Sequence, residues 1–232
     1  MNIKLSSKTV SNLFTTIVTL LVTVHILQAL LYHLAGFDYS GFIDLDTENN
    51  LPTFYTAMAL EFSAILLFLI YWQKKQSHRK ESLYWLGLAL IFAFLGFDET
   101  AQVHEEVSDF FTSIVEASGV LYFPWIIPYG LATGLVALIY WPWLIHLPKE
   151  TQKNFIIAGV VFLAGAIGME MIGAHHADLY DVYDWRYTIS YTVEETLEML
   201  GIVLFIRALM DYINQNIQQI TISFTQNDVD TD

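Results

Sequence analysis

The chain has 232 residues, of which 55% are hydrophobic, and its mean hydropathy is +0.46. It carries 10 Lys and Arg against 24 Asp and Glu, a formal net charge of −14, and no cysteine. This composition is too apolar for an ordinary soluble domain and argues against nucleic acid as a partner. It also excludes disulfides and thiolate-bound metal clusters, and no haem or nucleotide motif is present.

Six apolar stretches follow one another along the chain, each close to the roughly 20 residues needed to cross a bilayer. They predict an all-α, polytopic integral membrane protein with six transmembrane helices in a bundle over residues 1–213. The first stretch is longer than a signal-peptide core, so we expect it to be retained. A polar cytoplasmic tail is predicted over residues 214–232. The predicted spans are 10–34, 52–72, 83–107, 124–146, 154–177 and 188–212.

Basic residues predict the orientation of these spans. Nearly all of them fall on one side of the six-span arrangement, near the chain ends and in the loops around residues 74–80 and 149–153. Under the positive-inside rule this side is cytoplasmic, so both termini are expected in the cytoplasm and the protein in the plasma (inner) membrane. The six tryptophans lie at or just beyond the span ends, as in an aromatic belt.

Carboxylates inside apolar spans are costly and therefore indicate a functional site. At 1.5 Å per residue, Asp98 and Glu170 each lie about 22 Å from the cytoplasmic start of their spans. Glu61 lies about 13 Å, and Glu198 about 15 Å, from the outer start of theirs. Four helices are thus predicted to bring one carboxylate each to the same layer of the outer half, whereas the loop acids are expected to be solvated.

A Gly-x-acid-x5-His pattern occurs at residues 96–104 and again at 168–176. Both copies end a span that runs from inside to outside, which is compatible with a bundle built from helical-hairpin repeats. On an unbroken helix His104 would lie off the face that carries Asp98. We therefore expect a break or kink near Gly96 to bring His104 inward.

Several carboxylates in a low-dielectric site must be protonated, paired with cations or bound to a metal. Basic partners are nearly absent at this depth, and mixed carboxylate and imidazole ligands suit a divalent ion such as Zn, Fe or Mn. Either Glu61 or Glu195 is expected to act as the general acid or base. The predicted metal ligands are Asp98, His104, Glu170, His176, Glu194 and Glu198.

The leading functional hypothesis is a metal-dependent membrane enzyme that acts on a lipid or another apolar small molecule from an outward-facing site. A proton- or cation-coupled transporter, in which the same carboxylates relay charge, is an alternative. No continuous track of Asp, Glu, Lys or Arg runs on into the cytoplasmic half of the spans, which counts against transport. A non-catalytic sensing or assembly subunit is the third alternative.

Overall fold

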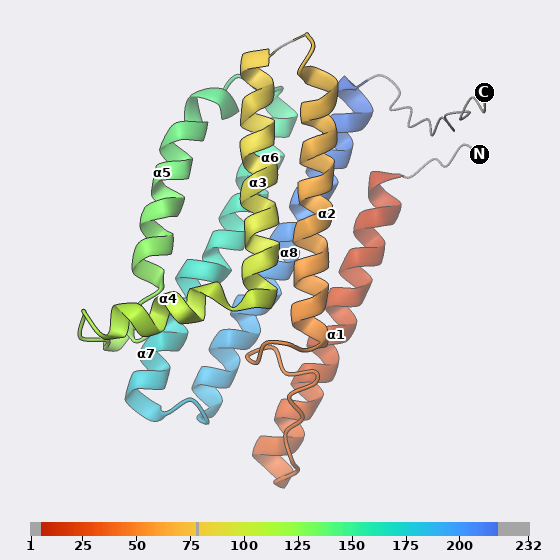
Figure 1. The fold of residues 1–232 in the computed structure, drawn as a ribbon. Coiled ribbons are helices and arrows are strands. Elements are labelled where there is room, and N and C mark those ends of the chain that lie inside the picture. Colours follow the sequence, from red (N-terminus) through yellow and green to blue (C-terminus); the bar gives the residue numbers. More distant parts are fainter. Residues whose placement is uncertain (1–5, 78, 218–232) are drawn as a thin grey trace, which may run out of the picture.

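The computed structural model describes residues 6–77 and 79–217, and every regular element in them is helical, so the all-α prediction is confirmed (Figure 1). Most of the predicted tail, from residue 218 onward, lies outside these ranges. The elements are α1 (Ser7–Ala35), α2 (Leu51–Lys74), α3 (Arg79–Ala101), α4 (Val103–Thr112), η1 (Gly119–Leu121), α5 (Ile126–Leu144), α6 (Lys149–Leu163), η2 (Ala164–Met169), α7 (Glu170–Tyr180) and α8 (Trp185–Asn216). The α6, η2 and α7 segments form one continuous helix with a π-helical turn at η2.

Five helices are long and apolar enough to cross a membrane, namely α1, α2, α3, α5 and the continuous helix Lys149–Tyr180. The α8 helix has the length but carries three glutamates and Arg207, so it is not among the five. Successive long helices run in opposite directions (Figure 1). The start of α1 and the end of α8 meet, because Ser7 Oγ donates a hydrogen bond to Asp211 Oδ1.

The α8 helix lies at the centre of the bundle and contacts α1, α2, α6 and α7. The main core forms around its second half, where Ile206 and Leu209 are fully buried against Leu67 and Ile70 of α2. Trp85 of α3 is only 1% exposed and packs against the ring of Tyr212. The polar residues are therefore left for the opposite half of the bundle.

The predicted span 83–107 is not one helix in the structure. The α3 helix ends at Ala101, Gln102 adopts a left-handed conformation (φ 57°, ψ 38°), and α4 then leads away to the side (Figure 1). The expected break therefore exists, but it lies at Gln102 rather than near Gly96. Gly96 instead allows a close approach of α2, since an added Cβ would lie 2.9 Å from Glu61 Oε1.

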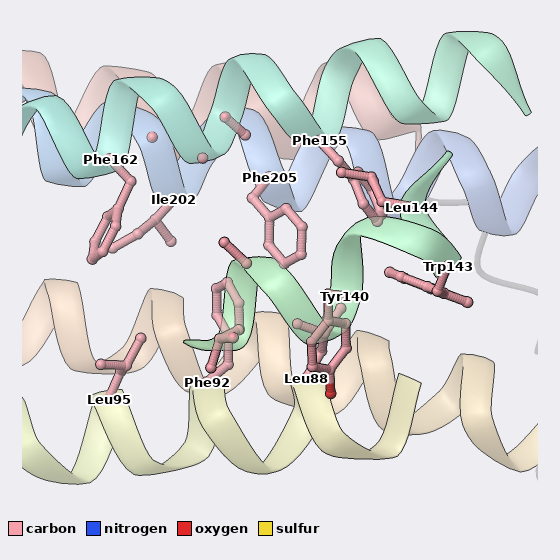
Figure 2. A pocket seen from close by; sticks show the side chains of 15 residues that line it. Leu88, Phe92, Leu95, Tyr140, Trp143, Leu144, Phe155, Phe162, Ile202 and Phe205 are labelled. Carbon is pink, nitrogen blue, oxygen red and sulfur yellow. The ribbon is translucent and has the colours of Figure 1, made fainter. Parts of the chain in front are cut away.

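The α5 helix stands apart from the bundle along its middle and is held near its two ends by aromatic contacts. At one end Trp143 packs edge-on against Trp85, with ring centroids 4.9 Å apart. At the other, Trp125 lies 5.4 Å from the His104 ring. Between these anchors lies an apolar cleft of about 250 Å³ (Figure 2). Its walls come from α3, α5, α6 and α8 and include Leu88, Phe92, Leu95, Val136, Phe155, Gly159, Phe162, Ile202 and Phe205.

Candidate metal centre

The polar half of the bundle encloses a cavity of about 800 Å³, called the chamber below. Its walls come from the loop 36–50, α2, α3, α4, α5, the α6–α7 helix and α8, together with Phe123 and Trp125 just before α5. The chamber contains one histidine, and its lining includes no Lys or Arg among the described residues. The carboxylates that line it are Asp46, Glu48, Asp98, Glu99, Glu105, Glu170, Glu194, Glu195 and Glu198.

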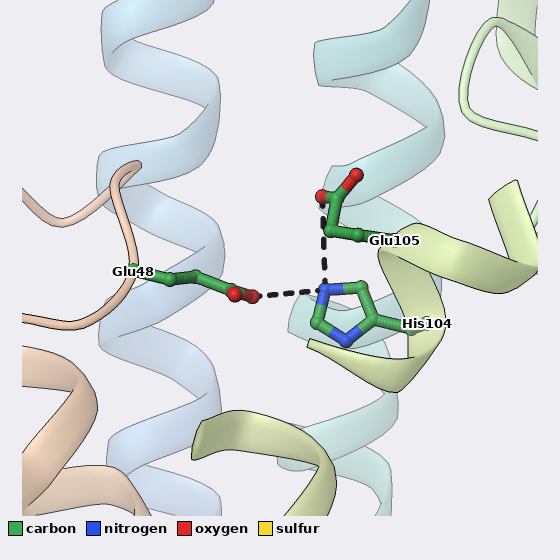
Figure 3. Close-up of side chains that lie close together, drawn as sticks. All are labelled: Glu48, His104 and Glu105. Atoms are coloured by element: carbon green, nitrogen blue, oxygen red, sulfur yellow. Dashed lines mark ion pairs between the residues drawn. The ribbon is translucent and has the colours of Figure 1, made fainter. Parts of the chain in front are cut away.

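His104 reaches the chamber because of the left-handed residue before α4. That turn folds the chain back so that the backbone N–H of His104 donates a 2.9 Å hydrogen bond to Asp98 Oδ1. The same carboxylate oxygen lies 3.4 Å from His104 Nδ1. The other ring nitrogen, Nε2, lies 3.0 Å from Glu48 Oε1 and 3.8 Å from Glu105 Oε1 (Figure 3). The imidazole is therefore oriented by Asp98 and directs Nε2 between two glutamates.

Three side chains of this arrangement lie close enough together to hold a metal ion. Within residues 6–77 and 79–217, Glu48, His104 and Glu105 each offer one ligand atom, and these atoms all lie within 4.8 Å of one another. Glu48 Oε2 is buried and has no hydrogen-bond partner in the described part of the chain, so a carboxylate acceptor is left over at this point. Metal-bound histidines usually donate their other ring N–H to a carboxylate, which is the position of Asp98.

The acids around His104 shift the pKa of its imidazole. Burial alone would lower the pKa of His104, but hydrogen bonds to Asp98 and Glu48 outweigh it and raise the pKa to about 10. The acids around this position therefore favour positive charge on or beside the His104 ring. Asp46 is exposed as a residue, yet burial of its carboxylate raises the pKa of that group to about 7. The 2.7 Å hydrogen bond that Tyr187 Oη donates to Asp46 lowers the pKa, but by less than burial raises it.

Glu48 is positioned by a loop with its own hydrogen-bond network. The side-chain amide of Asn50 donates to the carbonyls of Gly41, Asp44 and Thr47 at 2.7–2.9 Å. Its side-chain oxygen accepts a 3.1 Å bond from the N–H of Thr53, which caps the start of α2. One residue therefore closes the loop and begins the helix, and this fixes the segment that carries Glu48.

A buried histidine ties the same loop to the bundle. His25 of α1 is fully buried, and its Nδ1 accepts a 3.3 Å hydrogen bond from the backbone N–H of Leu45. Its Nε2 lies 3.0 Å from Thr192 Oγ1 of α8. Tyr39 Oη, 3.3 Å from His25 Nδ1, donates to Asp44 Oδ1. His25 thus has a structural role, as an interhelical hydrogen-bonding residue rather than a chamber ligand.

The opposite wall is built by close packing of η2 against α8. An added Cβ on Gly165 would lie 2.7 Å from the carbonyl oxygen of Glu194, so only glycine permits this approach. The π-helical turn ends immediately before Glu170, and π-turns of this kind occur often at functional sites. Trp125 Nε1 donates a 2.9 Å hydrogen bond to Glu170 Oε1 and so connects α5 to this wall.

The structure separates the predicted site residues into two groups. Glu61 and His176 are not among the residues that line the chamber. Glu61 lies against Gly96 in the contact between α2 and α3, and His176 Nδ1 lies 2.8 Å from Ser190 Oγ on α8. The remaining predicted residues all line the chamber, namely Asp98, His104, Glu170, Glu194, Glu195 and Glu198.

Four acids of the chamber were not predicted as site residues, and one of them, Glu99, directly follows the predicted ligand Asp98. Asp46 and Glu48 lie in a loop whose acids were expected to be solvated, and Glu105 directly follows the predicted ligand His104. For Asp46 and Glu48 the sequence did contain an indication of their position, in the segment that follows them. Asn50 and Pro52 mark a tight entry into α2. Such an entry holds the preceding residues close to the bundle.

Comparison with known proteins identifies one family. Residues 13–213 match the family described as "Domain of unknown function (DUF8692)", which covers most of the chain. The chain therefore belongs to this family. No curated protein and no solved structure matches it.

Proposed function

We propose that this member of the family is a multi-pass membrane protein that binds a divalent metal ion in an outward-facing chamber and uses it to transform a lipid-like or apolar small molecule. The observation that carries the proposal is the placement of His104, with Asp98 at Nδ1 and two glutamates at Nε2. Imidazole with carboxylates suits Zn, Fe or Mn.

In this proposal Glu48, His104 and Glu105 hold the metal, and Asp98 orients the imidazole. The ion would act as a Lewis acid or lower the pKa of a bound water. Glu170, Glu194, Glu195 and Glu198 line the deeper part of the chamber, where a neutral carboxyl can give a proton and a carboxylate can accept one. Of the metal ligands predicted from the sequence, only His104 belongs to this set. The proposed metal therefore lies closer to the loop 36–50 and to α4 than the sequence predicted.

The proposed topology has six spans, with α8 as the sixth, and both chain ends in the cytoplasm of a cell whose plasma membrane holds the protein. The three glutamates of α8 line the chamber, and a membrane helix usually accommodates charge by facing it toward such a cavity and not toward lipid. The basic residues around 74–80 and 149–153 lie at the end of the bundle away from the chamber. Under the positive-inside rule the chamber then faces outward.

Metal analysis tests the proposal directly. Purified protein incubated with Zn²⁺, Fe²⁺ or Mn²⁺ and then desalted is expected to retain about one ion per chain for at least one of them. Glu48→Gln should lower that content, because it removes a ligand charge, whereas Glu106→Gln on the exposed side of α4 should not. Wild-type protein that retains no ion under any of these conditions would overturn the metal proposal.

Cysteine labelling tests the topology, because the natural chain has none. Ser113→Cys, at the chamber end, should react with a membrane-impermeant maleimide on intact cells. Ser77→Cys, between α2 and α3, should react only after permeabilisation. The opposite result would reverse the proposed orientation without bearing on the metal site.

A further inference from the structure

The chamber adjoins the apolar cleft beneath α5. Leu88, Phe92 and Leu95 of α3 line both spaces. Val136 of α5 and Phe162 of α6 do so as well. The two adjoining spaces therefore place an apolar end beside a polar end, which is the division found in an amphiphilic molecule.

The apolar end, called the slot below, extends along several turns of α3. From Glu99, at the acidic end, to Leu88 the α3 wall rises over about 16 Å at 1.5 Å per residue. Gly159 of α6 opens the slot further, since an added Cβ there would meet no atom within 4 Å. This geometry suits a single extended hydrocarbon chain.

The polar end favours a cation. Nine carboxylates line the chamber, and its described lining offers no Lys or Arg to balance them. Aromatic rings line it too, among them Phe123, Trp125, Tyr129, Tyr187 and Tyr191. Carboxylates combined with aromatic faces are the groups by which proteins bind ammonium ions. One divalent ion at the rim offsets only part of the acidic charge.

We propose that the chamber and the cleft together bind a single-chain amphiphile with an ammonium head group, the head among the chamber acids and the tail between α3 and α5. This inference rests on the proposed function and names the substrate class of the same site. The tail enters from the side, through the gap between the two anchored ends of α5. The head then lies beside Trp125 and Glu170, near the proposed metal.

Photo-crosslinking tests the proposal on the full chain in lipid nanodiscs. The probe is a long-chain alkylamine with a diazirine in its tail, and the crosslinked peptides are identified by mass spectrometry. We expect saturable labelling of α3 around residues 88–95 and of α6 around 159–162. Unlabelled alkylamine should compete at least about tenfold better than the alkyl sulfate of equal chain length. Equal competition by the two would overturn the cationic head group.

A pair of glycine variants tests the tail site. Gly159→Phe fills the cleft without a clash at Cβ and should abolish the saturable labelling. Gly134→Phe, on the exposed side of α5 and also with open space at Cβ, should leave it unchanged. Equal labelling of both variants would overturn the cleft assignment. Both variants should retain metal, so loss of the cleft result with metal intact separates this inference from the proposed function.

Discussion

The two copies of the Gly-x-acid-x5-His pattern have different backbones. In residues 96–104 the helix stops, Gln102 turns left-handed, and His104 comes back to the Asp98 carboxylate. In residues 168–176 the helix continues beyond its π-helical turn, and His176 meets Ser190 instead. Both acids line the chamber, but only one histidine does. The spacing therefore places the acid, whereas one left-handed residue decides where the histidine goes.

The largest effect should distinguish the two histidines directly. His104→Ala removes the nitrogen ligand and is expected to abolish stoichiometric metal binding, as measured by elemental analysis. His176→Ala, the equivalent change in the second copy, should leave metal content unchanged. A loss of metal in both variants would show that the two copies contribute equally.

The acid that orients His104 should matter next. Asp98→Asn keeps the shape but weakens the hydrogen bonds that fix the ring, so metal affinity should fall by about 10- to 100-fold. Glu61→Gln, on α2 and outside the chamber, should leave the affinity near that of wild type. Isothermal titration with the retained metal measures both. Equal effects would return Glu61 to the site predicted from the sequence.

The left-handed turn gives a smaller effect, on stability. Gln102→Val places a β-branched residue at φ 57° and should destabilise the fold by about 1–2 kcal/mol. Gln102→Gly should be tolerated, because glycine adopts this conformation without steric cost. Thermal unfolding in detergent compares the two. If valine is accepted as well as glycine, the turn is not what holds His104 in place.

The smallest effect concerns the first residue of each copy. An added Cβ on Gly96 would lie 2.9 Å from Glu61 Oε1 and 3.3 Å from the carbonyl oxygen of Ala57. Gly96→Ala should therefore cost about 1 kcal/mol. The nearest atom to a Cβ on Gly168 is 3.9 Å away, so Gly168→Ala should be neutral within about 0.5 kcal/mol. Thermal unfolding of the pair in the same detergent measures the difference, and equal shifts would contradict it.

The sequence predicted the helical class and the convergence of the chamber acids, because apolar length and rise per residue are local quantities. Asp98, Glu170 and Glu198 reach one cavity from three helices, as the depth calculation required. Glu61 has a suitable depth but faces the α2–α3 contact. Depth alone does not give the direction of a side chain when helices can rotate.

The features of the site that the sequence did not predict depend on segments of irregular backbone. No periodicity places Glu48, because the loop before α2 takes its shape from the side chains of Asn50, His25 and Tyr39. The break at Gln102 occurs in a non-glycine residue, which propensity does not favour there. The π-helical turn before Glu170 likewise occurs without a proline that would indicate it in the sequence.

The α5 helix, anchored mainly at its ends, determines how any ligand of the cleft is selected. In the proposed membrane setting the slot opens toward acyl chains, which are as apolar as the leucines that line it. A tail that leaves the lipid for the slot exchanges one hydrocarbon environment for another and gains little from the transfer. Choice among membrane molecules then falls to the head group, and affinity is properly expressed as a mole fraction of lipid rather than a concentration in water.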